Sequence, residues 1–401
     1  MNKTVLLIGL LFFAGYVNAQ QFVNQENRYL NSAEKLLATD GRLTIGGYGE
    51  AHFNQPLGSE TRRNGSLDVH RMVMLFGYRF NNRTQFITEI EYEHVKEVFI
   101  EQAFLQYRIN NFIKFRAGLL LIPMGIINEY HEPTTFNGVE RPLIDKYIAP
   151  STWREIGFGF TGDVLPASLK YQVYVVNGFK SYDGSAKLSG KNGFRKGRQK
   201  GAESIISFPN ITGKVEYYGI RGLNIGLSGY FGKTQSTLYD GIVKGDNAAL
   251  AKADSSVVGI SMLGADARYS LKGLRLRGQY YLSYQSNTRQ YNYFTSKNGT
   301  PNDLGASMTG YYVEAGYNVF HPFDKMKTEL TPFIRYGAYN MHNSVVAGSA
   351  KNGAYNTKSI TTGLSWNLAR GAVLKADLQF LKTATGSQYS KVFNAGFGVM
   401  F

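Results

Sequence analysis

The sequence contains no cysteine, only 10 prolines among 401 residues, and no long hydrophobic run. Without cysteine, disulfide bonds and thiolate chemistry are excluded. The longest apolar stretch beyond the N-terminal region, 117–127, is interrupted by Pro123 and Gly125. It therefore falls short of the roughly 20 residues that a membrane-spanning helix needs.

Acidic residues are also scarce, since 29 Asp and Glu stand against 44 Lys and Arg, a formal charge of +15. A basic balance fits nucleic acid, acidic surfaces or small anions as partners. No basic run interleaved with stacking aromatic residues is present. The composition therefore gives no support for nucleic-acid binding.

The N-terminal residues have the features of an export signal. Lys3 precedes an uncharged apolar run, 5–16, and small residues follow up to Ala19. This pattern predicts a secretory signal peptide, residues 1–19. Because Lys3 is its only charged residue, the remaining chain carries +14. Export speaks further against a nucleic-acid partner.

The C-terminal ten residues alternate strictly. Phe393, Ala395, Phe397, Val399 and Phe401 are apolar, and small or polar residues stand between them. A period of two is that of a β-strand with one apolar face. An aromatic C-terminus on such a strand is typical of the closing strand of outer-membrane β-barrels. The alternative is an edge strand of a soluble sheet.

Sixteen segments show this strand period. In one of them Leu374, Ala376 and Leu378 alternate with Lys375 and Asp377. Glycine (45) and tyrosine (28), which barrels use in turns and at membrane interfaces, are abundant. The predicted strands are 42–53, 67–80, 84–95, 98–109, 112–120, 155–163, 168–178, 210–219, 222–232, 257–270, 274–286, 307–318, 328–340, 357–368, 372–382 and 390–401.

The connections between these segments alternate between short turns, such as 110–111, and long loops, such as 179–209. Outer-membrane barrels have short periplasmic turns and long outer loops. An even number of strands then leaves both chain ends on the periplasmic side. Two connections break the alternation, because 96–97 is very short and 319–327 is long.

The predicted fold is therefore all-β, a transmembrane antiparallel β-barrel of about 16 strands over residues 42–401. A short periplasmic segment, 20–41, precedes it, and Asn31 followed by Glu34 predicts a capped helix there. Sixteen strands enclose an aqueous channel. The connection 121–154 contains four prolines, and we expect it to fold inward and narrow the channel.

The same region carries a family resemblance. The segments 116–125, 140–142 and 153–157, together with Phe136, resemble the phosphate-selective porin O and P family. Supporting stretches are 67–71, 264–269, 310–314 and 335–336. The resemblance implies a sixteen-stranded trimeric outer-membrane porin. It leaves the solute open, because members of this family need not share one.

An anion-selective pore needs cationic or N–H donors at its constriction. Cations that strand parity directs into the lumen are candidates for lining the pore, with Arg154 at the end of the inward loop. The alternative is that they pair with wall carboxylates such as Asp266, Glu89 or Glu91. The pore-lining candidates are Arg71, Lys114, Arg116, Arg154, Arg268, Arg275, Arg277 and Arg335.

The inward loop itself is net acidic. Its charged candidates for the constriction are Glu129, Glu132, Glu140, Arg141, Asp145 and Lys146. An acidic loop opposite a basic wall predicts a transverse field, as in general diffusion porins. This arrangement favours a generic anion preference over a phosphate-specific site. The basic loop 179–209 allows anion recruitment, lipopolysaccharide binding or a plain solvated loop.

A barrel hydrolase and an adhesive or structural surface barrel are the rival classes. Barrel hydrolases use Ser–His or Asp–His pairs at the rim. None of the six histidines lies in a nucleophile or metalloprotease motif. Glu91 and Glu93 share one strand face while His94 takes the other, which speaks against a metal site there.

The sequence therefore predicts an outer-membrane porin of a Gram-negative bacterium rather than an enzyme, with no cofactor and no metal. Its expected partners are small anions or polar solutes, with phosphate as one candidate, membrane lipid and lipopolysaccharide, and two further copies in a homotrimer.

Overall fold

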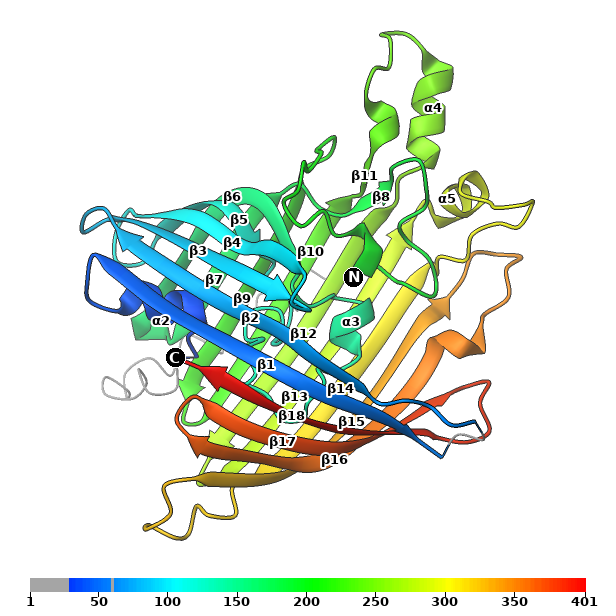
Figure 1. Cartoon of the computed structure of the whole chain (residues 1–401). Helices are drawn as coiled ribbons and strands as arrows, with labels where there is room; N and C mark the ends of the chain where they lie inside the picture. The colour runs from blue at the N-terminus through cyan, green and yellow to red at the C-terminus, as the bar shows by residue number, and fades with distance from the viewer. Residues whose placement is uncertain (1–28, 59–60) are drawn as a thin grey trace, which may run out of the picture.

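A computed structural model describes residues 29–58 and 61–401, so the predicted signal peptide lies outside the described residues. Sixteen strands form one closed antiparallel barrel (Figure 1), in which β18 closes onto β1. In chain order the barrel strands are β1 (Leu43–Leu57), β2 (Ser66–Arg79), β3 (Thr84–Glu93), β4 (Glu97–Arg108), β5 (Lys114–Leu121), β6 (Arg154–Val164), β7 (Leu169–Val176), β9 (Asn210–Ile220), β10 (Leu223–Lys233), β12 (Gly259–Leu271), β13 (Leu274–Ser286), β14 (Ser307–Tyr317), β15 (Glu329–Ser344), β16 (Asn356–Ala369), β17 (Ala372–Thr383) and β18 (Ser390–Met400).

The remaining elements are short and lie before β1 or in the connections between strands. Two small strands, β8 (Lys180–Tyr182) and β11 (Gln235–Ser236), pair in parallel. The helices are α2 (Ser32–Ala38), α3 (Ile144–Tyr147), α4 (Asn247–Ser255) and α5 (Thr288–Phe294). Within the described residues, none of the helices has the length and apolar character to cross a membrane.

The predicted fold class is confirmed. Each of the sixteen predicted strands is present, with ends that differ by at most four residues from those predicted. The largest differences are at the ends of β1 and β15, which continue to Leu57 and Ser344. In β1 and β15 the backbone pairing continues past the alternating segment, because polar residues also pair well in a β-ladder.

The two ends of the barrel differ. At one end, called here the terminal end, β1 begins and β18 ends, and Gly47 and Phe401 exchange backbone hydrogen bonds of 2.9 Å. Tight turns join strands there, and Gly222 and Gly273 supply the positive φ (76° and 81°) that two-residue turns require. Apart from 318–328, which lies at the terminal end, the long connections gather at the opposite end, called the loop end, where α4 extends beyond the barrel (Figure 1).

The strand faces alternate as the sequence predicts. On β17, Leu374 and Leu378 point outward and are 42% and 37% exposed, whereas Lys375 and Asp377 point inward and are buried. On β18, Phe397 is exposed and Asn394 is buried. The barrel thus has an apolar outer surface and a polar inner wall, which is the inverse of a soluble protein.

Part of the barrel interior is packed. Trp153 is fully buried and stacks on Phe179 with ring centroids 4.3 Å apart, while Tyr230 of β10 lies 4.7 Å from Trp153. Phe179 stacks in turn on Phe194. This aromatic group joins the loop after β7 to the loop after β5, so both loops are held against the inner wall.

Candidate functional site

The connection between β5 and β6, residues 122–153, lies inside the barrel and is called the inner loop. The backbone N–H of Ile126 donates to Oε1 of Gln279 on β13 at 2.6 Å. The backbone N–H of Val139 donates to Oδ2 of Asp377 on β17 at 2.7 Å. Both acceptors belong to the inward face of the wall.

The inner loop also contacts the other side of the ring. Arg71 of β2 donates to the carbonyl oxygen of His131 at 2.6 Å, and Lys214 of β9 donates to the carbonyl oxygen of Gly125 at 2.6 Å. Strands β2, β9, β13 and β17 are distributed around the barrel. The inner loop therefore crosses the lumen.

Asn128 sets the shape of the inner loop. Its side-chain amide donates to the carbonyl oxygens of Ile122 and Trp153 at 2.8 Å each, and its Oδ1 accepts the N–H of Trp153 at 2.8 Å. Gly125 turns the chain just before, with φ of 66°. One asparagine thus connects the two ends of the 32-residue inner loop.

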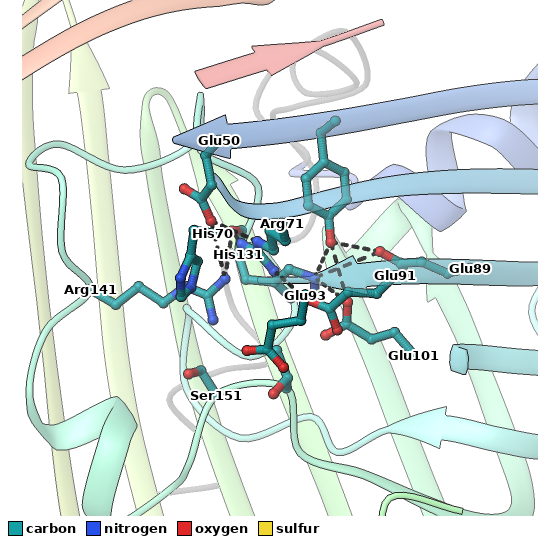
Figure 2. A network of polar contacts seen from close by, with 12 residues as sticks. Glu50, His70, Arg71, Glu89, Glu91, Glu93, Glu101, His131, Arg141 and Ser151 are labelled. Carbon is teal, nitrogen blue, oxygen red and sulfur yellow. Dashed lines mark hydrogen bonds and ion pairs between the residues drawn. The ribbon is translucent and has the colours of Figure 1, made fainter. Parts of the chain in front are cut away.

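A first cluster, the His131 latch, fastens the inner loop to β1, β3 and β4 (Figure 2). The Tyr48 hydroxyl lies 2.7 Å from Oε1 of Glu89 and 2.9 Å from Nε2 of His131, and Glu101 lies 3.5 Å from the same nitrogen. Burial lowers the pKa of His131, but Glu101 and Glu89 outweigh it and raise that pKa to about 10. The protonated imidazole donates from Nδ1 to the carbonyl oxygen of Asn128 at 3.0 Å.

Arg71 lies beside this latch, as Figure 2 shows. Its Nε donates to Oε1 of Glu50 at 2.6 Å, and its Nη1 lies 3.7 Å from Glu91. Arg141 of the inner loop approaches the same Glu50 oxygen at 3.8 Å. Two arginines and two carboxylates therefore share a site where each charge has an opposite neighbour.

A second cluster, the Glu314 latch, fastens the middle of the inner loop to β13, β14 and β15. Glu314 accepts from Arg335 at 2.6 Å, lies 3.2 Å from Arg277, and accepts from Asn137 of the inner loop at 3.0 Å. Arg335 also donates to the carbonyl oxygens of Asn137 and Glu140. Removing one partner of such a buried pair costs about 3–5 kcal/mol, because the other charge is left uncompensated.

A third cluster centres on Lys214 of β9. Its Nζ lies 3.3 Å from Asp266, 3.5 Å from Glu216 and 3.5 Å from Glu129 of the inner loop. Arg268 donates to Glu216 at 2.7 Å. Glu129 is thus an anchoring residue of the inner loop.

Asp145 of α3 has no cationic partner within ion-pair distance in the described part of the chain. It accepts from Gln279 Nε2 at 2.7 Å and from the Tyr281 hydroxyl at 3.1 Å. Burial raises the pKa of Asp145 to about 7, although these two hydrogen bonds act in the opposite direction. The carboxyl group therefore titrates near neutral pH.

The three other candidates of the inner loop have different surroundings. Glu140 lies 3.4 Å from His52, and although burial raises the pKa of Glu140, its bond to His52 brings that pKa down to about 2. Glu132 accepts from the backbone N–H of Ser32 at 3.0 Å. Lys146 is exposed. Each of the four carboxylates of the inner loop thus has a polar partner, and most of the acidic charge of the loop is engaged in attaching it.

Six of the eight predicted pore-lining cations form ion pairs. Besides the four already described, Arg275 lies 2.5 Å from Glu329 and Lys114 lies 3.6 Å from Asp163. Arg116 instead donates to Gln106 at 2.9 Å. These six contacts agree with the alternative interpretation of the sequence, in which the cations pair with wall carboxylates. The role of the eight cations toward a solute stays a prediction.

Arg154 belongs to a group of cations that we call the Arg154 cluster: Arg154, Arg195, Arg198 and Lys200. Nε and Nη2 of Arg154 are buried with no hydrogen-bond partner among the described residues. Lys200 and Arg154 both lie over the ring of Phe99, at 4.2 and 5.6 Å. Burial and the charges of Arg195 and Arg154 lower the pKa of Arg198 to about 9. The cluster lies at the loop end, where β4 runs past its pairing with β5.

The N-terminal helix α2 closes on the inner loop from the terminal end. The predicted cap is confirmed, since Asn31 accepts from the N–H of Glu34 at 2.9 Å. Glu34 pairs with Lys170 of β7 at 2.8 Å. In Figure 1, α2 lies at the barrel end that also holds the C-terminus.

Two cavities open beside this helix at the terminal end. One of about 260 Å³ is lined by four cations, Arg79, Arg108, Lys114 and Arg116, against two carboxylates, Glu34 and Asp163. The other, of about 690 Å³, is lined by Lys35, Lys327 and Arg370 against Glu329. Cationic side chains thus outnumber acidic ones in both cavities.

Two groups of side chains have the residue types of a metal site. In the first, Glu89, Glu101 and His131, the Tyr48 hydroxyl and the Arg71 guanidinium already occupy the surroundings. The second, around Asp68, lies at the loop end. In the described residues no histidine hydrogen-bonds a serine or threonine hydroxyl, so no Ser–His pair is seen there.

Sequence reasoning missed Tyr48, His131, Asn128 and Lys214. Strand parity places Lys214 and Glu216 on one face, so that signal was available. The other three depend on the path of the inner loop, which has no period. Their roles follow only from the tertiary contacts.

The fold and the inner loop define the class: a closed sixteen-stranded antiparallel barrel with a loop across its lumen, which is similar in fold to solved outer-membrane porins. The anion-selective porin from Comamonas acidovorans has a TM-score of 0.57 and 13% identity, over 90% of this chain and 99% of that one. OmpF of Salmonella typhi has a TM-score of 0.56 and 14% identity, over 90% and 97%. OmpT, an outer membrane protein of Vibrio cholerae, has a TM-score of 0.55 and 12% identity, over 91% and 99%. At these identities the likeness shows the fold alone.

The family follows from sequence. A protein of Aquifex aeolicus (strain VF5), described as an uncharacterized protein, is 31% identical over 357 residues, which cover 86% of this chain and 77% of that protein. The chain belongs to the same family as this Aquifex protein. No family model matches the sequence.

Proposed function

We propose that the protein is an outer-membrane porin, a water-filled channel for passive diffusion of small polar solutes. The observation that carries the proposal is the inner loop, fastened across the lumen of a closed sixteen-stranded barrel by buried ion pairs. A loop held in this way narrows the aqueous path and keeps a fixed position in it. The terminal end then faces the periplasm.

A mild preference for anions forms the second part of the proposal. Most inner charges are paired, so they contribute little net field. The excess of positive charge lies on either side of the inner loop, in the Arg154 cluster and in the two terminal-end cavities. A low-dielectric wall focuses the field of such cations into the pore and concentrates anions there.

The solute, the oligomeric state and the surface contacts are further parts of this proposal. The resemblance to the phosphate-selective porin O and P family supports phosphate as one of the solutes. OmpT of Vibrio cholerae is described in a trimer form, and we propose a homotrimer here too. The exposed apolar outer face fits membrane lipid, and the basic loop 179–209 fits contact with lipopolysaccharide. We also propose that the exported chain loses residues 1–19.

Reconstitution in planar bilayers tests the proposal. The purified protein should give steady single-channel conductance, and in a KCl gradient the reversal potential should shift toward that of chloride. The shift should shrink at high salt, because the Debye length falls from about 10 Å at 0.1 M to about 3 Å at 1 M. A cation-selective channel would contradict the anion preference. The absence of conductance together with lipid or peptide hydrolysis would favour the barrel hydrolase.

A further inference from the structure

Three of the six histidines gather at the loop end around one carboxylate. Oδ2 of Asp68 lies 2.6 Å from Nδ1 of His94 and 3.4 Å from Nδ1 of His70. The ring of His52 stacks on that of His70 with centroids 4.8 Å apart and an interplanar angle of 12°. The donor atoms of Asp68, His70 and His94 all lie within 4.8 Å of one another.

Two local irregularities of the strands lie at these donors, a bulge in β2 and the turn after β3. The register of β1 and β2 shifts so that Glu50 faces Arg71 and Ala51 faces Val69, which leaves His70 as the extra residue of a bulge. A bulge re-aims a side chain that regular alternation would send to the other face. Asp68 and His70, two residues apart, share one face of β2, and because of the bulge Arg71 points to this side as well.

The turn after β3 supplies the third donor. His94 and Val95 adopt positive φ of 54° and 62°, and the N–H of His94 donates to the carbonyl oxygen of His70 at 3.2 Å. This turn overrides the alternation from which we expected His94 to point away from its neighbours. The imidazole instead reaches back over β2 to Asp68.

The donor set and its spacing suit a borderline-soft dication. Zn²⁺ binds imidazole nitrogen and carboxylate oxygen at roughly 2.0–2.2 Å, so the donors of a tetrahedral site lie about 3.4 Å apart. The distance from Asp68 to His70 has this value, and the distance from Asp68 to His94 needs to open by less than 1 Å. The side chain of His94 is 46% exposed, which leaves access for the ion and for a water ligand.

Carboxylates lie close to this group. Glu93 lies 3.8 Å from Nε2 of His94. The stacked His52 is held between Glu50 at 3.3 Å and Glu140 at 3.4 Å, which fixes the face against which His70 rests. Two arginines act on His70, Arg141 and Arg71, and both face Glu50, at 3.8 and 2.6 Å. Such supporting contacts orient the ligands of metal sites.

We propose that Asp68, His70 and His94 bind one divalent transition-metal ion of the Zn²⁺ type at the loop end of the barrel. The ion ties the turn 94–96 to β2 and adds a double positive charge to that end. This assignment is independent of the proposed porin function, because it concerns metal binding and not conduction.

Calorimetric titration of the detergent-solubilised full-length barrel with ZnCl₂ tests this site. We expect one strong site per chain in the wild type and at least about tenfold weaker binding in His94→Ala and in Asp68→Asn. His321→Ala is the matched control, since His321 is exposed in the connection 318–328 at the other end, and its affinity should equal the wild-type value. His94 lies in an exposed turn, so its variant should still fold, which heat-modifiable migration on gels verifies.

Equal Zn²⁺ affinity of the wild type and folded His94→Ala would overturn the proposal, and so would the absence of a strong site in the wild type. Co²⁺ gives an independent readout. A visible absorption band of tetrahedral intensity should appear in the wild type and be lost in His94→Ala, and a spectrum unchanged by that substitution would also contradict the site.

Discussion

The hydroxyl of Tyr48, on the first strand of the barrel, lies 2.9 Å from Nε2 of His131, in the loop that crosses the lumen. The same hydroxyl lies 2.7 Å from Glu89. Tyr48 is 1% exposed and His131 is 2% exposed. A single phenol thus joins the wall to the inner loop at a site that water does not reach.

Tyr48→Phe removes that hydroxyl and keeps the ring. We expect the free energy of unfolding to fall by about 1–3 kcal/mol, because Glu89 and His131 each lose a buried partner. Denaturant unfolding of the barrel measures the change. Open-channel noise should also rise, because the inner loop is held less firmly.

Tyr280→Phe is the matched control for that substitution. Tyr280 points outward from β13 and is 43% exposed. Its change should alter the free energy of unfolding by less than about 0.5 kcal/mol. Equal effects of the two substitutions would show that the Tyr48 contact contributes nothing specific.

Asp145 should make stability depend on pH. Its pKa is raised from 3.8 to about 7, so the native state favours the neutral carboxyl group. The stabilising contribution is complete below about pH 4 and is lost as pH rises to about 7. Between pH 5 and pH 8 the wild type should lose on the order of 2–3 kcal/mol relative to Asp145→Asn.

Thermal or denaturant unfolding at the two pH values checks this difference. Asp145→Asn keeps an oxygen acceptor for Gln279 and Tyr281 but does not ionise. Parallel pH profiles of the two proteins would contradict a raised pKa for Asp145.

Reversing two cations of the smaller terminal-end cavity should shift ion selectivity. Arg79 and Arg108 both line that cavity. The variant Arg79→Glu with Arg108→Glu should move the reversal potential toward cations, because it inverts the charge along the path. The effect should be largest at low salt.

The control for this variant changes the net charge by the same amount. Arg221 and Lys325 are exposed on turns at the same end, and they line neither of the two terminal-end cavities. Arg221→Glu with Lys325→Glu should leave the reversal potential nearly unchanged. Equal shifts in both variants would show that the total charge, and not the cavity, determines selectivity.

Most of the barrel could be predicted because its strands obey one simple period. Leu374 and Asp377 belong to opposite faces for a geometric reason that the sequence displays directly. The exceptions occur where the backbone departs from that period. The backbone at the bulge of His70 and at the turn of His94 does not follow the alternation, so the group around Asp68 was not predicted.

The position of the inner loop could be predicted from the sequence, but its path through the barrel could not. Its length and prolines indicated an unusual connection, yet the anchoring of Glu129 by Lys214 and of Asn137 by Glu314 joins residues far apart in the chain. The net acidity of the loop is also offset by partners that the sequence does not display. Buried pairing with Lys214 and His52 consumes the charges that a residue count leaves free.

Deleting part of the inner loop shows whether this loop narrows the channel. Residues 132–145 are replaced by a short Gly-Ser linker. A deletion of equal length, residues 240–253 around the protruding helix α4, serves as the control (Figure 1). In correctly folded barrels, we expect a higher single-channel conductance for the first variant and wild-type conductance for the second. Unchanged conductance in the first variant would contradict this expectation.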